Sequence, residues 1–279
     1  MNKRKIQLGH SPDPDDAFMF YAISKGYIDT GDLELEDILQ DIQTLNEWAK
    51  EGKLEVTALS VYGYGMVSDR YALLPYGASV GNKYGPIIVT RQPMTVEELK
   101  TKKIAIPGIL TTAFLTLKLM LGDFDFVVVP FHEIMRRVAE GEFTAGLIIH
   151  EGQLTYQESG LIKVLDLGEW WYSQTQLPLP LGVNTVRKDL GMDIMKKVAR
   201  ILKQSIDYAL GHREIALHHA LKYTDLMDIG LVDQFVGMYV NEDSLDFNEN
   251  TRKAVEILFQ KAKEKGLLPD TATMDIVEP

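Results

Sequence analysis

The best candidate for proton transfer in this sequence is His150. It follows a run of small or apolar residues from Gly146 to Ile149, which predicts a buried strand that ends at the histidine. Imidazole is the natural general base near neutral pH. A histidine that only hydrogen-bonds a neighbouring loop is the alternative, and this pattern leaves both open. His10 also follows a short strand, but it adjoins a turn, so we expect it to bind or position rather than to catalyse.

The segment from Pro107 to Thr112 carries two adjacent hydroxyls. It predicts the end of a strand, a turn and the start of a helix, with Thr111 and Thr112 where the helix begins. Free backbone N–H groups and hydroxyls at a helix N-terminus can hold a carboxylate. The competing interpretation is that Thr111 serves only as the N-cap of the helix.

Three aspartates, Asp13, Asp15 and Asp16, surround Pro14 at another predicted helix start. A divalent metal site is one interpretation of this cluster. Helix capping and compensation of the helix dipole explain the same residues, and the chain has no second acidic cluster of suitable spacing. We therefore expect no metal site, and contact between these aspartates and a ligand stays open.

The composition excludes several classes of function. The chain has 279 residues, a net charge of -11 and no cysteine. Disulfides, thiolate nucleophiles and iron–sulfur clusters are thus ruled out, and the acidic balance argues against nucleic-acid binding. No apolar run approaches the roughly 18 residues of a membrane span, and no secretory signal follows Met1. The cytoplasm is the expected compartment, with no membrane partner.

The elements that must position these residues are short apolar strands alternating with helices, which is typical of parallel α/β sheets. A β-rich stretch near 86–90 and a return strand near 180 predict that the chain crosses twice between two lobes. After the return strand the sequence is almost entirely helical, at about 193–209, 213–223, 229–240 and 248–265.

The expected fold class is therefore α/β with two lobes and a two-strand hinge. Residues 1–88 and 185–279 form a discontinuous first lobe, and residues 89–184 form an inserted second lobe of ordinary domain size. Ligands of α/β sheets gather beyond the carboxyl ends of strands. Because each lobe contributes two polar strand ends, the pattern predicts a cleft between the lobes for a small anionic molecule.

Several motifs, taken in order, resemble the family that makes 1,4-dihydroxy-6-naphthoate in the futalosine route to menaquinone. The matching stretches run from residue 10 to residue 182, and each is short. They are His10-Ser11-Pro12-Asp13-Pro14-Asp15-Asp16-Ala17-Phe18-Met19-Phe20, Thr57-Ala58-Leu59-Ser60, Asp69-Arg70-Tyr71, Gly85-Pro86, Pro107-Gly108, Thr111-Thr112, Gly146-Leu147-Ile148-Ile149-His150-Glu151, Leu154-Thr155-Tyr156 and Leu177-Pro178-Leu179-Pro180-Leu181-Gly182.

The resemblance implies a periplasmic-binding-protein-like (type II) fold with mixed sheets that works as an enzyme. It implies a lyase that converts cyclic dehypoxanthinyl futalosine, a benzoate-bearing spiro compound, to 1,4-dihydroxy-6-naphthoate and dihydroxyacetone, with no cofactor. The family's catalytic base maps to His150. Its substrate-binding residues map to Ala58, Leu59, Ser60, Thr111 and Thr112, and we expect His10 and Asp16 to contact the substrate as well.

Two rival functions remain at this point. The first is the sister enzyme of the same pathway and fold, which dehydrates chorismate; the stretch from Ser11 to Phe20 and the pair His150-Glu151 favour the synthase. The second is a non-catalytic solute-binding protein for an aromatic carboxylate. We expect the lack of a signal peptide to count against it.

Overall fold

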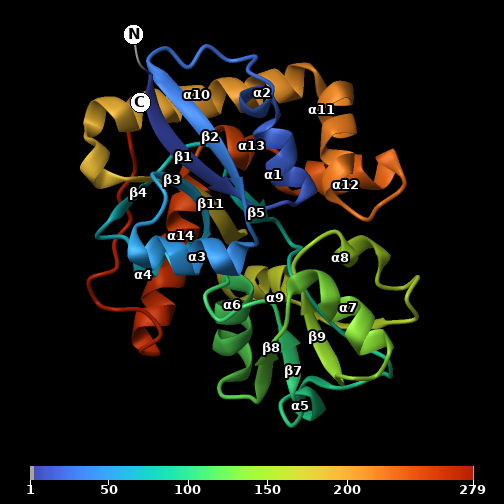
Figure 1. The fold of residues 1–279 in the computed structure, drawn as a ribbon. Helices are drawn as coiled ribbons and strands as arrows, with labels where there is room; N and C mark the ends of the chain where they lie inside the picture. The colour runs from blue at the N-terminus through green and yellow to red at the C-terminus, as the bar shows by residue number, and fades with distance from the viewer. Residues whose placement is uncertain (1–2, 279) are drawn as a thin grey trace.

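The computed structural model describes residues 3–278, which form two α/β lobes, one above the other in Figure 1. The upper lobe is built on a mixed sheet of order β2-β1-β3-β11-β4, with β5 also paired to β11. Its strands are β1 (Arg4–His10), β2 (Leu33–Leu39), β3 (Val56–Ser60), β4 (Tyr71–Leu73), β5 (Ser79–Gly81) and β11 (Leu179–Arg187). β1 runs parallel to β2 and β3, whereas β11 is antiparallel to its three neighbours.

The lower lobe contains a second mixed sheet, of order β10-β6-β9-β7-β8. Its strands are β6 (Ile87–Thr90), β7 (Ile104–Ile106), β8 (Phe126–Val128), β9 (Ala145–Ile148) and β10 (Ile162–Asp166). β7 is parallel to β8 and β9, and β6 is antiparallel to β9 and β10. Every residue of β3, β6, β7 and β9 is buried, as the continuous apolar pattern of these strands predicts.

Helices cover both sheets. The upper lobe has α1 (Pro14–Met19), α2 (Tyr21–Ser24), α3 (Ile42–Glu51), α4 (Val61–Met66), α10 (Met192–Gly211), α11 (Arg213–Ala220), α12 (Ile229–Tyr239), α13 (Glu242–Leu245) and α14 (Glu249–Glu264). The lower lobe has α5 (Val96–Leu99), α6 (Thr112–Leu121), α7 (Phe131–Ala139), α8 (Gly152–Thr155) and α9 (Leu167–Thr175). Short 3-10 turns lie at Lys188–Leu190 and Leu221–Tyr223. No helix within residues 3–278 is both long and apolar enough to cross a membrane.

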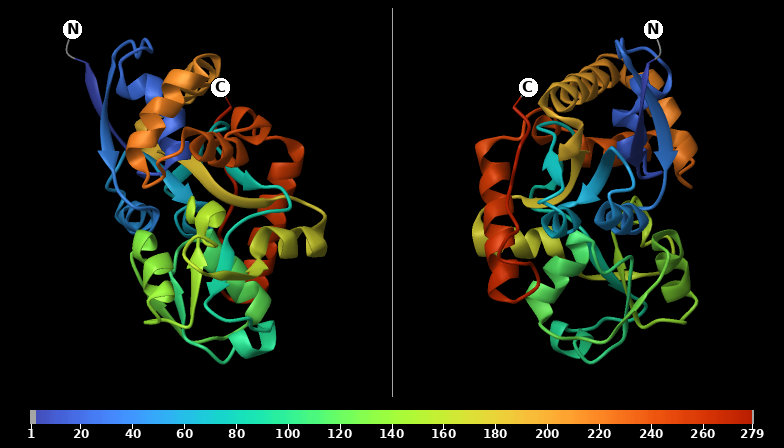
Figure 2. Two further views of the ribbon diagram at one scale, coloured as in Figure 1. Left: turned by 90° about the vertical axis from the view of Figure 1, so that its right-hand side faces the viewer. Right: turned by 60° about the vertical axis from the view of Figure 1, so that its left-hand side comes forward.

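The two lobes share part of their core. One apolar cluster lies within the upper lobe, between β1 and helices α1, α10, α11 and α12. A second cluster extends through both lobes and includes Leu59 and Tyr62 from the upper lobe with Leu115 and Leu147 from the lower. The C-terminal helix α14 contacts α4 and α6, and Figure 2 shows it alongside both lobes. The lobes are therefore packed together beneath the cleft.

The predicted two-lobed α/β fold with mixed sheets is confirmed. The chain leaves the upper sheet after β5, enters the lower sheet at β6, and returns to the upper sheet at β11. The expected lobe boundaries at 88/89 and 184/185 thus fall inside β6 and β11, each of which belongs to a single sheet. The helical tail of the chain wraps back over the upper lobe (Figure 1).

Candidate active site

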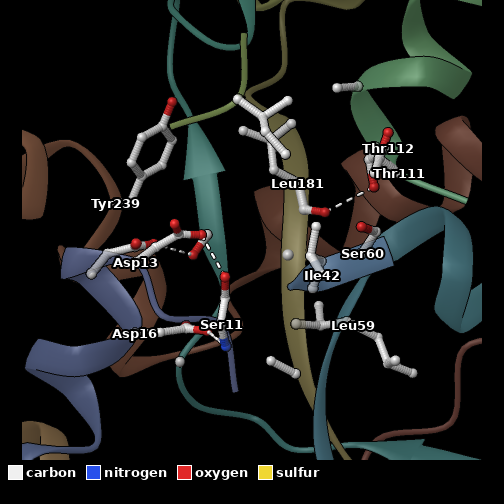
Figure 3. Close-up of a pocket in the computed structure, with 18 of the residues that line it drawn as sticks. Ser11, Asp13, Asp16, Ile42, Leu59, Ser60, Thr111, Thr112, Leu181 and Tyr239 are labelled. Atoms are coloured by element: carbon white, nitrogen blue, oxygen red, sulfur yellow. Dashed lines mark hydrogen bonds between the residues drawn. The ribbon is translucent and has the colours of Figure 1, made fainter. Parts of the chain in front are cut away.

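A cleft of about 740 Å³, counting the part open to solvent, lies where the two lobes meet. Figure 3 shows two different ends: carboxylates from the start of α1 on one side, and the hydroxyls of Ser60, Thr111 and Thr112 on the other. Apolar side chains lie between them, and they include Ile42, Ala58, Leu59, Ile149 and Leu181.

The first end of the cleft is formed by the N-terminus of α6. Thr111 is its N-cap: the Thr111 hydroxyl accepts the Phe114 N–H at 3.1 Å and donates to Gly108 O at 2.9 Å. The Thr112 hydroxyl donates to Leu181 O at 2.8 Å and accepts the Tyr62 N–H at 3.1 Å. Both hydroxyls are therefore occupied, which supports the capping interpretation for Thr111.

The donors that remain at this end are backbone groups and one serine. The first N–H groups of a helix have no partner inside the helix, and Thr112 and Ala113 at the start of α6 line the cleft. Across from them, the Ser60 N–H donates to Asn46 Oδ1 at 3.0 Å, and Ser60 Oγ accepts from Asn46 Nδ2 at 3.1 Å. Because Ser60 Oγ is the acceptor in this contact, its own proton is free for a ligand. Asn46 was not predicted as a site residue, because in the sequence it is only one polar residue within a helix, and its burial is evident only in the structure.

The opposite end of the cleft is acidic. Asp13 stands at the N-cap position of α1, with Pro14 next, as predicted, but its side chain makes no capping hydrogen bond. Instead it accepts the Ser11 hydroxyl at 2.6 Å, and Asp16 accepts the Ser11 N–H at 2.8 Å. Asp15 faces the Ser79 hydroxyl at 3.4 Å. All three aspartates line the cleft, so capping alone does not explain them.

Burial makes these carboxyls hard to ionise. Burial, and then the charge of Asp15, raises the pKa of Asp13 well above its ordinary value. Burial, and then the charge of Asp16, raises the pKa of Asp15 to about 7. Burial also raises the pKa of Asp16, although the His10 charge opposes it. Within residues 3–278 no three acidic or histidine side chains gather closely enough to hold a metal ion.

His10 lies behind the cleft wall and not among the residues that line it. Its Nε2 is 2.9 Å from Asp37 Oδ1, its Nδ1 is 2.9 Å from Ser11 O, and its ring stacks on Phe20 with 4.6 Å between centroids. Burial lowers the pKa of His10, but Asp37, the Asp16 charge and the Ser11 carbonyl together more than offset this effect, and the net pKa is raised. The structure thus places His10 in an ion pair with β2, where we had expected a contact with the substrate.

His150 is also turned away from the cleft. Ile149 lines the cleft, and the next side chain, His150, points to the other side, toward α7. Its Nδ1 accepts the Gly152 N–H at 3.0 Å, and its Nε2 is 3.2 Å from Phe131 O. In this geometry Nδ1 is placed to accept a hydrogen bond and Nε2 to donate one. The loop-bonding alternative therefore describes the histidine in this conformation.

Glu151, next to His150, connects the two lobes. Its Oε2 is 3.5 Å from His150 Nδ1, and its Oε1 accepts a hydrogen bond from the Thr224 hydroxyl of the upper lobe. Burial raises the pKa of Glu151, but His150 and Thr224 outweigh burial and hold it below its ordinary value. Another hydrogen bond between the lobes runs from the Tyr239 hydroxyl to Gln153 Oε1 at 2.8 Å. The structure is thus a form in which the lobes touch at the cleft mouth.

Solved structures share this architecture. A protein from Archaeoglobus fulgidus is 43% identical, with a TM-score of 0.91 over 95% of this chain and 98% of that one. A Candida albicans protein, described as having the generic periplasmic binding protein structural fold, is 13% identical with a TM-score of 0.73, over 96% of this chain and 92% of that one. The second likeness shows the fold alone, and it confirms the periplasmic-binding-protein-like class.

Sequence comparisons identify the family. Two curated relatives are both named 1,4-dihydroxy-6-naphtoate synthase. The one from Thermus thermophilus is 41% identical over 94% of this chain and 95% of its own length. The one from Streptomyces coelicolor is 35% identical over 96% of each. A family model described as menaquinone biosynthesis matches residues 6–264. The predicted resemblance is confirmed, and the chain belongs to the menaquinone biosynthesis family.

Proposed function

We propose that this protein is a 1,4-dihydroxy-6-naphthoate synthase. In this proposal it is a carbon–carbon lyase that converts cyclic dehypoxanthinyl futalosine to 1,4-dihydroxy-6-naphthoate and dihydroxyacetone, and it needs no cofactor. The observation that carries the proposal is the match to two synthases over nearly the full length of the chain. The cleft between the lobes supports it, because its two ends suit a molecule with one aromatic carboxylate end and one polar end.

The substrate carboxylate belongs at the α6 end of the cleft. The helix N-terminus carries a partial positive charge and free N–H groups that favour an anion. Thr112 and Ala113 border the cleft there, with the Ser60 hydroxyl nearby. The aromatic ring then lies over the apolar side chains of Leu59 and Leu181. The reverse orientation would bring the carboxylate against three aspartates.

His150 is our candidate for the general base. Its Nδ1 is in a hydrogen-bond-accepting position, and the Glu151 carboxylate beside it can stabilise the imidazolium that forms when a proton is taken. To reach the cleft, the ring must leave Phe131 O and turn past Ile149. Removal of a substrate proton then sets off carbon–carbon cleavage, and aromatisation of the new ring supplies much of the driving force.

Incubation of the purified protein with cyclic dehypoxanthinyl futalosine, followed by mass spectrometry, tests this function. We expect 1,4-dihydroxy-6-naphthoate and dihydroxyacetone in equal amounts. Chorismate in a parallel reaction should stay unchanged. Dehydration of chorismate would instead identify the sister enzyme, and tight binding of the futalosine compound with no product would identify a solute-binding protein.

A further inference from the structure

The acidic end of the cleft is a wall of hydrogen-bond acceptors. It is lined by Asp13, Asp15 and Asn184, together with the hydroxyls of Ser11 and Ser79. None of the described residues that line the cleft is a lysine, arginine or histidine. A wall with many acceptors and no cationic side chain is suited to a ligand that donates hydrogen bonds, and it repels a carboxylate.

Asn184 of β11 supplies an acceptor that has no partner. Its side-chain Nδ2 donates to Gly77 O at 2.9 Å, which fixes the orientation of the amide. Its Oδ1 is buried and has no hydrogen-bond partner in the part of the chain that the structure describes, and the residue is only 1% exposed. Buried polar atoms are nearly always paired in folded proteins. An unpaired oxygen in the wall of a ligand cleft is therefore a place for a ligand donor.

The geometry around Gly77 preserves this arrangement. A Cβ atom at Gly77 would lie 2.4 Å from Asn184 Nδ2, and the φ angle of Gly77 is +75°, which favours glycine. The Gly77 backbone thus comes close enough to Asn184 to bind its Nδ2 through Gly77 O, and Asn184 Oδ1 stays without a partner in the part of the chain that the structure describes. Asp15 lines the same cleft, and its carboxylate accepts only a long hydrogen bond, of 3.4 Å, from Ser79 Oγ, which a ligand donor could supplement.

We propose that Asp13, Asp15 and Asn184 form a subsite for the hydroxyl-bearing, sugar-derived end of the substrate. This inference rests on the proposed function, which supplies a substrate with an aromatic carboxylate at one end and a sugar-derived ring at the other. The hydroxyls of that ring donate to Asn184 Oδ1 and to the two carboxyls. The raised pKa values of Asp13 and Asp15 support this assignment, because a poorly solvated carboxylate gains most from such donors.

The test compares two ligands on four proteins at pH 8. The ligands are cyclic dehypoxanthinyl futalosine and 2-naphthoate, an aromatic carboxylate without hydroxyls. The proteins are the wild type, Asn184→Leu, Asp15→Asn and the control Asp166→Asn. Asp166 is also a buried aspartate with a raised pKa, about 6, but it caps α9 and does not line the cleft. Dissociation constants are measured by calorimetry with His150→Ala added to each of the four proteins, so that the futalosine compound is not consumed, and thermal melting shows that each variant folds.

We expect Asn184→Leu to weaken binding of the futalosine compound about tenfold or more, and Asp15→Asn about fivefold, with 2-naphthoate binding within twofold of wild type. The control should change neither. Equal affinities of all four proteins for the futalosine compound, or equal losses for both ligands, would overturn the subsite.

Should Asn184→Leu fail to fold, the affinities of Asp15→Asn decide whether the subsite exists. Turnover by the wild type is measured separately: its absence contradicts the proposed function, whereas the two affinities still decide the subsite. A wild type that binds neither ligand would overturn both.

Discussion

Replacement of Asp15 by asparagine should make the ligand-free protein more stable above pH 7. Burial and the Asp16 charge raise the pKa of the Asp15 carboxyl from its ordinary 3.8 to about 7. Each pKa unit corresponds to about 1.4 kcal/mol, so the ionised carboxylate destabilises the fold by about 4 kcal/mol as an upper bound. Asp15 is only partly buried and faces the water of the cleft. We therefore expect about half of this value, near 2 kcal/mol.

The effect has a definite dependence on pH. Between about pH 4 and pH 7 the folded state keeps a proton that the unfolded state has lost, so stability falls as the pH rises through this window. Asparagine does not titrate. The free energy of unfolding of Asp15→Asn therefore exceeds that of the wild type by an amount that grows from near zero at pH 4 to its full value above pH 7. With about 2.1 cal/mol/K of unfolding entropy per residue, 2 kcal/mol in a chain of 279 residues raises the melting temperature by about 3 °C.

Melting temperatures of Asp15→Asn and wild type at pH 5 and pH 8 measure this difference. Asp270→Asn is the matched control, because Asp270 is exposed and its variant should melt like the wild type at both pH values. The reasoning would be refuted if Asp15→Asn melted at or below the wild-type temperature at pH 8. It would also be refuted if the variant gained equally at both pH values, since that gain would not come from the titration of Asp15.

Three further changes test the site. His150→Ala should lower the rate of naphthoate formation by about 10²–10⁴-fold with little loss of substrate affinity; near-normal turnover would remove His150 from the mechanism. Tyr239→Phe deletes the 2.8 Å bond to Gln153 that joins the lobes and should raise KM about three- to tenfold; an unchanged KM would show that this bond does not hold the closed form. Thr112→Val leaves two backbone groups unpaired and should cost about 1–3 kcal/mol in urea unfolding. Thr112→Ser keeps the hydroxyl and should be nearly neutral; equal stability of the two variants would contradict the assigned bonds.

The helical tail and the strand ends could be predicted from the sequence because they follow from local patterns. The helix expected at about 193–209 is α10, Met192–Gly211, and that expected at about 229–240 is α12, Ile229–Tyr239. Ser60 ends β3 of the upper lobe and Thr112 begins α6 of the lower lobe, and both line the one cleft. Helix α9, Leu167–Thr175, was not among the predicted elements.

Side-chain directions could not be predicted in the same way. His10 ends β1 and His150 follows β9, yet each is held by contacts that no local pattern contains, Asp37 for the first and Phe131 O for the second. Asn184 joins the cleft only because β11 returns to the upper sheet and places its amide against Gly77, 107 residues earlier. Such long-range pairings decide which polar groups are left free for a ligand.

The central claim is that one cleft holds the whole substrate, with its carboxylate at the start of α6 and its hydroxyls at the acidic wall. A crystal structure of His150→Ala with cyclic dehypoxanthinyl futalosine tests it most directly. We expect the carboxylate within hydrogen-bond distance of the Thr112 and Ala113 N–H groups and the Ser60 hydroxyl, and a sugar-derived hydroxyl on Asn184 Oδ1. A carboxylate at the aspartates, or a substrate bound outside the cleft, would contradict it.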